Sequence, residues 1–336
     1  MRWAAAAVIA LVGLAGQDRP TFRAGTSAIA VDVAVNDGRR TVTGLTAADF
    51  ELTDNGAPQE IEAASLEHLP FDLTLVVDTS GSLSGAPLAQ FKKDIASIGA
   101  MLSPNDRFRL VTFATRASDA FGWQPGAADP PVARIAAGGA TAFYQAIAAS
   151  LLRPSEPGRR QLIVALSDGY DTVSFLDAPD VRDLARRADG VLHIVLRRVY
   201  GPRGAVMTMR TSPADTTLVS GQSPSDPTGV ANRIDLAAPL PVPRSFGWVP
   251  YSGPGANDVL RDAAELTGGR LRQAEAAESL TNVFRTALDE FRTSYVLWYT
   301  PKGVPASGWH TIRVSVKKGK YTIRHRSGYD AGGNRP

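Results

Sequence analysis

Four strongly apolar segments alternate with helical patterns in the middle of the chain. The apolar segments are FDLTLVVD, RFRLVTFAT, RQLIVALSDGYD and VLHIVLRR, and patterns with helical spacing such as APLAQFKKDIASIGAML and GGATAFYQAIAASLL lie between them. A nearly continuous apolar strand is typical of a parallel sheet that is covered on both faces. The alternation therefore predicts an α/β fold with a doubly wound, mostly parallel sheet.

Strand-like patterns flank this region on both sides. AIAVDVAVND and ADFELTDNGAPQEI alternate around the turn signals NDG and DNG, which predicts a small β module over residues 22–69. The α/β domain is then expected over residues 70–290, with a Pro/Gly/Ser-rich insertion at 199–257. SYVLWYT, HTIRVSVKK and YTIRHRSGY predict further strands over residues 291–330. Whether these strands pack against the N-terminal module is left open by the pattern.

The first residues predict export. MRWAAAAVIALVGLAGQ places Arg2 before an apolar stretch from Trp3 to Ala15, the layout of a signal peptide over residues 1–16. The stretch is shorter than the roughly 20 residues that span a bilayer, so we expect no permanent membrane span after cleavage, and a periplasmic or secreted product. An uncleaved anchor is the alternative.

Composition excludes several classes of function. The chain has 336 residues and no cysteine, which rules out disulfides, thiolate zinc sites and a cysteine nucleophile. The net charge is only +3, and the basic residues are spread along the chain, so no nucleic-acid partner is expected.

The segment LVVDTSGSLSG sets Asp78, Ser80 and Ser82 at alternate positions directly after the first apolar strand. It lacks the G-x-S-x-G pattern of a nucleophile elbow and the spacing of a phosphate-binding loop. Mg²⁺ prefers oxygen ligands, so one carboxylate with hydroxyls is chemically sensible. Thr141 and Asp168 follow at positions that a doubly wound sheet brings to the same edge. Taken singly, these residues also fit helix caps and turns.

In that order, DTSGS, GGATAFYQAI and ALSDG resemble the metal-ion-dependent adhesion site of von Willebrand factor type A domains. The resemblance implies that Ser80, Ser82 and Thr141 bind Mg²⁺ through their hydroxyls, with Mn²⁺ as a substitute. Asp78 and Asp168 would act mainly through bound waters. Ala140 departs from the usual glycine-glycine-threonine. The flanking segments are similar to those of exported von Willebrand factor A-related proteins of Acidobacteria.

The resemblance implies metal-dependent binding of a protein or peptide that presents a carboxylate. An enzyme is not expected, because no histidine, lysine or free carboxylate stands beside the site as a general base. A structural or envelope-assembly scaffold, with a fold-stabilising metal and contacts made by the β modules, is the alternative, and a metal-dependent hydrolase is a weaker one. We interpret His193 as a buried core residue and Asp171 as a surface loop residue, with a secondary role near the metal as the alternative for Asp171.

Overall fold

The structure is a computed structural model that describes residues 28–332, except residues 39, 67–68, 82–84, 198–254 and 276–277. The predicted signal peptide lies outside the described residues, as do Ser82 and almost all of the predicted insertion. No helix in the described ranges is long and apolar enough to cross a bilayer.

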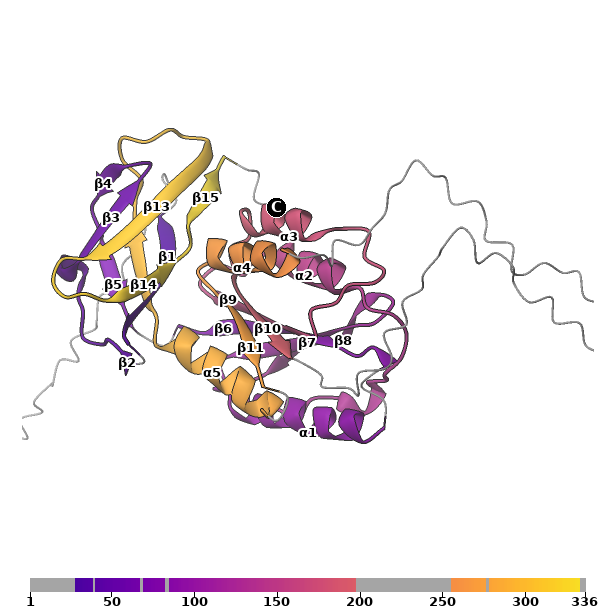
Figure 1. The fold of residues 1–336 in the computed structure, drawn as a ribbon. Helices are drawn as coiled ribbons and strands as arrows, with labels where there is room; N and C mark the ends of the chain where they lie inside the picture. Colours follow the sequence, from indigo (N-terminus) through magenta and orange to yellow (C-terminus); the bar gives the residue numbers. More distant parts are fainter. Residues whose placement is uncertain are drawn as a thin grey trace, which may run out of the picture.

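A six-stranded sheet forms the centre of the α/β part of the molecule (Figure 1). Every residue of its central strands is buried, apart from the last residue of one of them. Neighbouring strands are parallel except for the last pair, which is antiparallel. The predicted doubly wound α/β fold class is therefore confirmed. The strand order is β11 (Leu271–Ala274), β10 (Val191–Arg197), β9 (Arg160–Ser167), β6 (Phe71–Asp78), β7 (Arg107–Phe113) and β8 (Ala117–Pro125).

Helices cover both faces of this sheet (Figure 1). One face packs against α1 (Ala86–Ala100) and α5 (Leu280–Arg292). The other face packs against α2 (Phe143–Leu151), α3 (Ala178–Ala185) and α4 (Ala256–Leu266). Short 3₁₀ turns lie at Ala47–Asp49 and Val132–Arg134. Because successive residues of a strand point to opposite faces, β6 contributes side chains to both apolar layers.

The last helix before the terminal strands carries one buried apolar stripe. Leu280, Phe284, Leu288 and Phe291 are all buried on α5, and the Phe291 ring meets the Phe71 ring edge to face at 5.4 Å. This spacing of three and four residues places one face of the helix on the sheet.

The flanking segments of the chain form a two-layer β-sandwich. One sheet has the order β14 (Thr322–His325), β1 (Ile29–Asp37), β12 (Tyr295–Tyr299) and β5 (Ala63–Ser65), with β2 (Arg40–Thr41) beside β1. The other has the order β15 (Gly328–Ala331), β13 (Gly308–Val316), β3 (Phe50–Asp54) and β4 (Ala57–Gln59). Each sheet therefore combines strands from both ends of the described chain, and a shared apolar core lies between them.

The turn between β3 and β4 follows the predicted DNG signal. Asn55 and Gly56 have φ values of 46° and 83°, as a tight hairpin turn requires at both central positions. Three features of the strands were not predicted. The edge strands β8 and β11 were missed, and the single strand expected at YTIRHRSGY divides into β14 and β15, which belong to different sheets.

A buried arginine connects the sandwich to the α/β domain. Arg160, the first residue of β9, donates hydrogen bonds to Asp32 of β1 at 2.7 Å and to the Phe291 carbonyl of α5 at 2.9 Å. It also donates to the Ser294 hydroxyl at 2.6 Å. The sandwich is thus attached at the amino end of β9.

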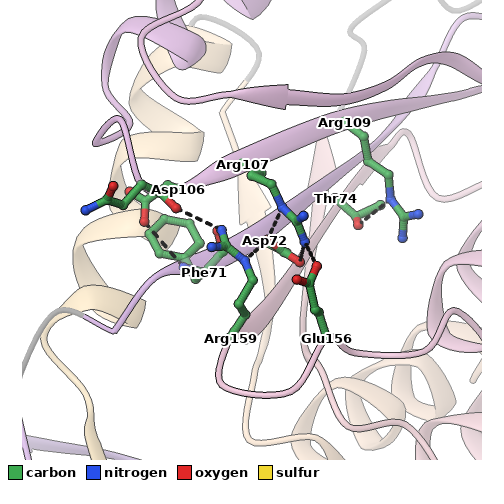
Figure 2. A network of polar contacts seen from close by, with 9 residues as sticks. Phe71, Asp72, Thr74, Asp106, Arg107, Arg109, Glu156 and Arg159 are labelled. Carbon is green, nitrogen blue, oxygen red and sulfur yellow. Dashed lines mark hydrogen bonds and ion pairs between the residues drawn. The ribbon is translucent and has the colours of Figure 1, made fainter.

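A second polar network lies at the same amino ends of the strands (Figure 2). The buried carboxylate of Asp72 accepts hydrogen bonds from Arg107 at 3.0 and 2.6 Å and from Arg159 at 2.6 Å. Arg107 also contacts Glu156. These ion pairs fix the edge of the sheet opposite to the carboxyl ends of the strands.

Candidate functional site

Asp78 lies at the carboxyl edge of the central sheet. It is the last residue of β6, between β7 and β9. Its Oδ1 atom accepts a hydrogen bond from the backbone N–H of Ser80 at 2.8 Å, and its Oδ2 atom accepts one from the Ser167 hydroxyl at 3.4 Å. Because Ser167 ends β9, the carboxylate connects the ends of two neighbouring strands.

Burial raises the pKa of Asp78, and the nearby carboxylate of Asp168 raises it further. Hydrogen bonds from the backbone and side chain of Ser80 act in the opposite direction but do not cancel the effect. Within the part of the chain that the structure describes, neither Asp78 nor Asp168 forms an ion pair with a basic side chain. The site therefore holds two neighbouring acidic groups whose charge is not compensated.

Asp168 follows β9 in a tight turn. Its Oδ1 atom accepts the N–H of Tyr170 at 3.1 Å, and Gly169 adopts a φ of +90° while donating its N–H to the Ser167 hydroxyl at 3.1 Å. The turn role considered for Asp168 from sequence is thus present. One of its carboxylate oxygens is used in this turn.

Thr141 lies in the loop before α2, and its backbone is fixed on both sides. Its N–H donates to the Thr172 hydroxyl at 2.9 Å, and its carbonyl accepts the N–H of Thr172 at 2.8 Å. The residue is 9% exposed. Its own hydroxyl has no hydrogen-bond partner among the described residues. A hydroxyl that no protein group uses is available as a ligand.

Backbone hydrogen bonds join the Thr141 loop to the segment after Asp78. The N–H of Gly138 donates to the Thr79 carbonyl at 2.9 Å, and the N–H of Gly81 donates to the Gly139 carbonyl at 3.3 Å. Gly139 has a φ of +88°, and a Cβ atom there would lie 2.5 Å from the Thr115 hydroxyl. Glycine is therefore required at this position for the Thr141 loop to pack against Thr115.

Asp171 is not a surface loop residue, and that interpretation was wrong. It is 2% exposed and accepts hydrogen bonds from the N–H groups of Tyr144 and Ser174, both at 2.8 Å, and from the Ser174 hydroxyl at 2.6 Å. It caps the start of α2 from a distant part of the chain. No local pattern in the sequence signals this role, because the capped helix lies 27 residues away in the chain.

The helix-cap interpretations are also wrong for the residues that the structure describes. The N-cap of α1 is Gly85, not Asp78 or Ser80, and the N-cap of α2 is Ala142, not Thr141. Asp171 and Ser174 accept the hydrogen bonds of the first N–H groups of α2. The Thr141 side chain therefore does not cap this helix.

Four of the five predicted site residues thus lie on loops that hydrogen bonds hold together at one edge of the sheet: Asp78, Ser80, Thr141 and Asp168. Ser82 lies outside the described residues. No group of three or more histidine, cysteine, aspartate or glutamate side chains in the described ranges is arranged to hold a metal. The predicted set contains two such side chains, and its other members are hydroxyls. Two uncompensated carboxylates beside hydroxyl oxygens fit a hard divalent cation.

The family comparison matches the same part of the chain. A family model described as von Willebrand factor type A domain matches residues 72–197. These residues run from β6 to the end of β10 and include every predicted site residue. A curated human relative, inter-alpha-trypsin inhibitor heavy chain H4, is 30% identical over 141 residues. The match covers 37% of this chain and 15% of that relative's length.

Solved structures with a similar arrangement are distant in sequence. A von Willebrand factor type A protein from Catenulispora acidiphila is 10% identical, with a TM-score of 0.38 over 93% of this chain and 75% of that chain. The VWA2 paralog of ArnB from Sulfolobus acidocaldarius is 15% identical, with a TM-score of 0.35 over 51% of this chain and 44% of that chain.

Proposed function

We propose that residues 72–197, which match the von Willebrand factor type A domain model, form a protein-interaction module that binds one Mg²⁺ ion at the carboxyl edge of its sheet. The ion then accepts a carboxylate of a protein or peptide partner. Mn²⁺ has similar ligand preferences and would substitute.

The observation that carries the proposal is the uncompensated charge of Asp78 and Asp168. Both carboxylates lie where burial and mutual repulsion raise the pKa of Asp78, and no basic side chain of the described chain pairs with either. Such an arrangement is unfavourable unless a cation offsets it.

Hydroxyls would be the direct ligands in this proposal. Ser80, Ser82 and Thr141 would bind the ion directly, whereas Asp78 and Asp168 would act mainly through waters. Because a hydroxyl carries no formal charge, the ion would keep most of its positive charge and attract a carboxylate from outside. Binding rather than catalysis is proposed, since the described histidines, His193, His310 and His325, lie in β10, β13 and β14 and not on the site loops.

We also propose that the protein is exported from the cytoplasm, because its first residues have the pattern of a signal peptide. Expression in a bacterial host followed by N-terminal sequencing of the fractionated protein tests this. Cleavage near residue 16 supports export, and an intact N-terminus retained in the membrane fraction contradicts cleavage.

Isothermal titration of metal-stripped protein with Mg²⁺ and Mn²⁺ tests the metal site, using Thr141→Val and Thr141→Ser as a matched pair. Wild type and Thr141→Ser are expected to bind about one ion per chain, whereas Thr141→Val keeps the shape but lacks the hydroxyl and is expected to lose at least tenfold in affinity. Equal affinities for all three proteins would exclude Thr141 as a ligand.

Thermal melting separates this function from the scaffold alternative. Mass action predicts a modest rise in Tm when Mg²⁺ is added to a protein that is already folded. A metal-stripped chain that is unfolded at 25 °C would instead assign the ion a mainly structural role.

A further inference from the structure

A groove runs along α2, beside the loops of the candidate metal site. It has a volume of about 350 Å³ and is lined by the outward face of α2 and the segment before α3, with Arg116 at one side. Leu152 and Phe175 contribute to its walls and are 63% and 66% exposed. The groove is large enough for a bulky apolar side chain.

Exposed apolar residues are concentrated at this place. Within the described chain, large hydrophobic side chains are exposed at Trp123, Leu152, Tyr170, Val173 and Phe175. Four of these lie at the end of α2 or on the segment that connects Asp168 to α3. Clustered exposure of this kind marks an interaction surface, whereas isolated exposed residues do not.

The groove is physically continuous with the metal-site loops. Gln145 lines the groove and donates its backbone N–H to the Ser174 hydroxyl at 3.1 Å. It follows Thr141 by four residues and lies in the first turn of α2, whose N-cap is Ala142. Thr115, the neighbour of Arg116, accepts the N–H of Ala140 through its hydroxyl at 3.1 Å. A ligand bound at Thr141 therefore has the groove directly beside it.

The charge at the groove indicates the kind of ligand. Arg116 is exposed and forms no ion pair with any residue that the structure describes. Under the proposed function, a bound divalent cation adds a second positive centre at the adjoining edge. The surface then combines two cationic points with an apolar trough between α2 and the Phe175 segment. Its complement is a peptide with acidic residues next to a large apolar side chain.

We propose that this groove, here called the α2 groove, is the specificity pocket for such an acidic, apolar peptide segment of a partner protein. The proposal rests on the proposed metal-dependent function. One carboxylate of the peptide binds the ion, a neighbouring Phe, Leu, Ile or Met side chain occupies the groove, and a second acidic residue pairs with Arg116.

A displayed random-peptide library, selected on the full chain with Mg²⁺, provides the probe. Enriched peptides are expected to carry Asp or Glu within a few residues of a large apolar side chain. Their affinities are then measured by fluorescence polarisation for wild type, Phe175→Ser, Phe175→Leu, Arg116→Gln and Arg285→Gln. Arg285 is an exposed residue of α5, on the opposite face of the sheet, and serves as the control for Arg116.

Phe175→Ser is expected to weaken peptide binding about tenfold, from the loss of one buried aromatic contact. Phe175→Leu should restore most of it. Arg116→Gln should weaken binding several-fold in low salt, and Arg285→Gln should have no effect. All four variants should bind Mg²⁺ like wild type in calorimetry, because none alters a site residue.

The outcomes separate this inference from the proposed function. If Mg²⁺ binding is normal but the selected peptides bind the Phe175 variants as tightly as wild type, or if no peptides are selected, the peptide-binding role of the α2 groove is overturned. The proposed metal site is unaffected by that result. Absence of Mg²⁺ binding would overturn the proposed function, and peptides that bind equally in a chelator would overturn the metal-anchored part of the inference. Concentration-dependent dimerisation that Phe175→Ser abolishes would assign the groove to self-association instead.

Discussion

Asp78, a residue of the proposed metal site, carries a cost in stability. Its carboxylate is held at the end of a central strand by Ser80 and Ser167, and its pKa is raised by burial and by Asp168. Because the pKa of Asp78 is higher in the folded protein than in the unfolded chain, folding disfavours the ionised form of this carboxyl. The contribution of Asp78 to the free energy of unfolding is therefore fully present below the ordinary pKa of 3.8 and is lost as the pH rises through the higher pKa of the folded protein. At neutral pH the metal-free site therefore destabilises the domain.

Replacing Asp78 with asparagine should separate these two effects. Asp78→Asn keeps an acceptor for the Ser80 N–H but removes the charge, so the metal-free variant should be more stable than wild type at pH 7, by an amount on the order of 1 kcal/mol. It should lose the rise in Tm that Mg²⁺ gives to wild type. Melting curves with and without Mg²⁺ measure both effects, and a variant that still responds fully to Mg²⁺ would remove Asp78 from the site.

His193 should determine part of the acid sensitivity of the fold. It is 4% exposed in β10, as the sequence interpretation had it. Burial lowers its pKa to about 3, with further effects from Arg324 and Arg270. Because the folded pKa lies below the ordinary value of 6.5, stability is fully present above pH 6.5 and is lost as pH falls toward 3, by about 2 kcal/mol at pH 5.

The test compares wild type with His193→Leu by urea unfolding at several pH values. The free energy of unfolding of wild type should fall more steeply between pH 6.5 and pH 4.5 than that of the variant. Parallel curves would show that His193 is protonated without penalty in the folded chain.

At the scale of elements, the site depends on a cap that is remote in sequence. Asp171 and Ser174 cap the N-terminus of α2, and Thr172 fixes the backbone of Thr141. The segment after β9 thus positions the hydroxyl of a different loop, much as outer-shell groups orient metal ligands.

Asp171→Asn should therefore weaken Mg²⁺ binding although Asp171 is not a proposed ligand. The amide has one acceptor oxygen in place of two, so it cannot satisfy both the N–H of Tyr144 and the N–H of Ser174, and we expect a loss of about tenfold in affinity. Asp177→Asn is the matched control, since Asp177 caps α3 by accepting the Asp180 N–H at 3.0 Å. That control should leave the Mg²⁺ affinity unchanged in calorimetry, and equal effects of the two substitutions would contradict a positioning role.

The buried elements could be predicted from sequence because their signal is strong. The apolar runs of β6, β7, β9 and β10 and the stripe of α5 are dictated by burial alone. The edge strands carry less of this signal. Only Phe121 is buried in β8, and only Ala274 is buried among the four residues of β11. Their positions depend on pairing with a neighbouring strand, which a local pattern does not encode.

The candidate site was predictable in the same uneven way. The D-x-S-x-S order and the positions of the strand ends predicted a site at the carboxyl edge of the sheet. The structure places the predicted site residues that it describes at this edge. The role of Asp171 was not visible, because the residue lies in a polar turn that resembles an exposed loop and its partner is a helix N-terminus about 27 residues earlier in the chain. Long-range caps of this kind require the fold to be known.

For the whole molecule, the sandwich and the candidate site lie at opposite edges of the central sheet. Arg160 attaches the sandwich at the amino end of β9, and Asp168 follows its carboxyl end. The strand has eight residues, so the two are separated by about 25 Å. The sandwich therefore leaves the edge with Asp78 and Thr141 accessible to a partner.

Arg160 should be a main determinant of how the two parts are joined. Arg160→Met removes hydrogen bonds to Asp32, Ser294 and the Phe291 carbonyl, and we expect a loss of about 2–4 kcal/mol. Arg153→Met is the control. It removes a pair with Asp119 whose side chains are 31% and 41% exposed, and should cost less than about 1 kcal/mol. Chemical unfolding measures both, and similar losses would show that the hydrogen bonds of Arg160 are not a main determinant of the junction.

The most direct test of the central claim is a crystal structure of the protein soaked in Mn²⁺, with anomalous scattering measured at the manganese absorption edge. We expect one strong anomalous peak at the carboxyl edge of the sheet, within direct bonding distance of the hydroxyl oxygens of Ser80, Ser82 and Thr141, and loss of that peak in Thr141→Val. An anomalous map with no peak at this edge, or with a peak bound only by residues elsewhere, would contradict it.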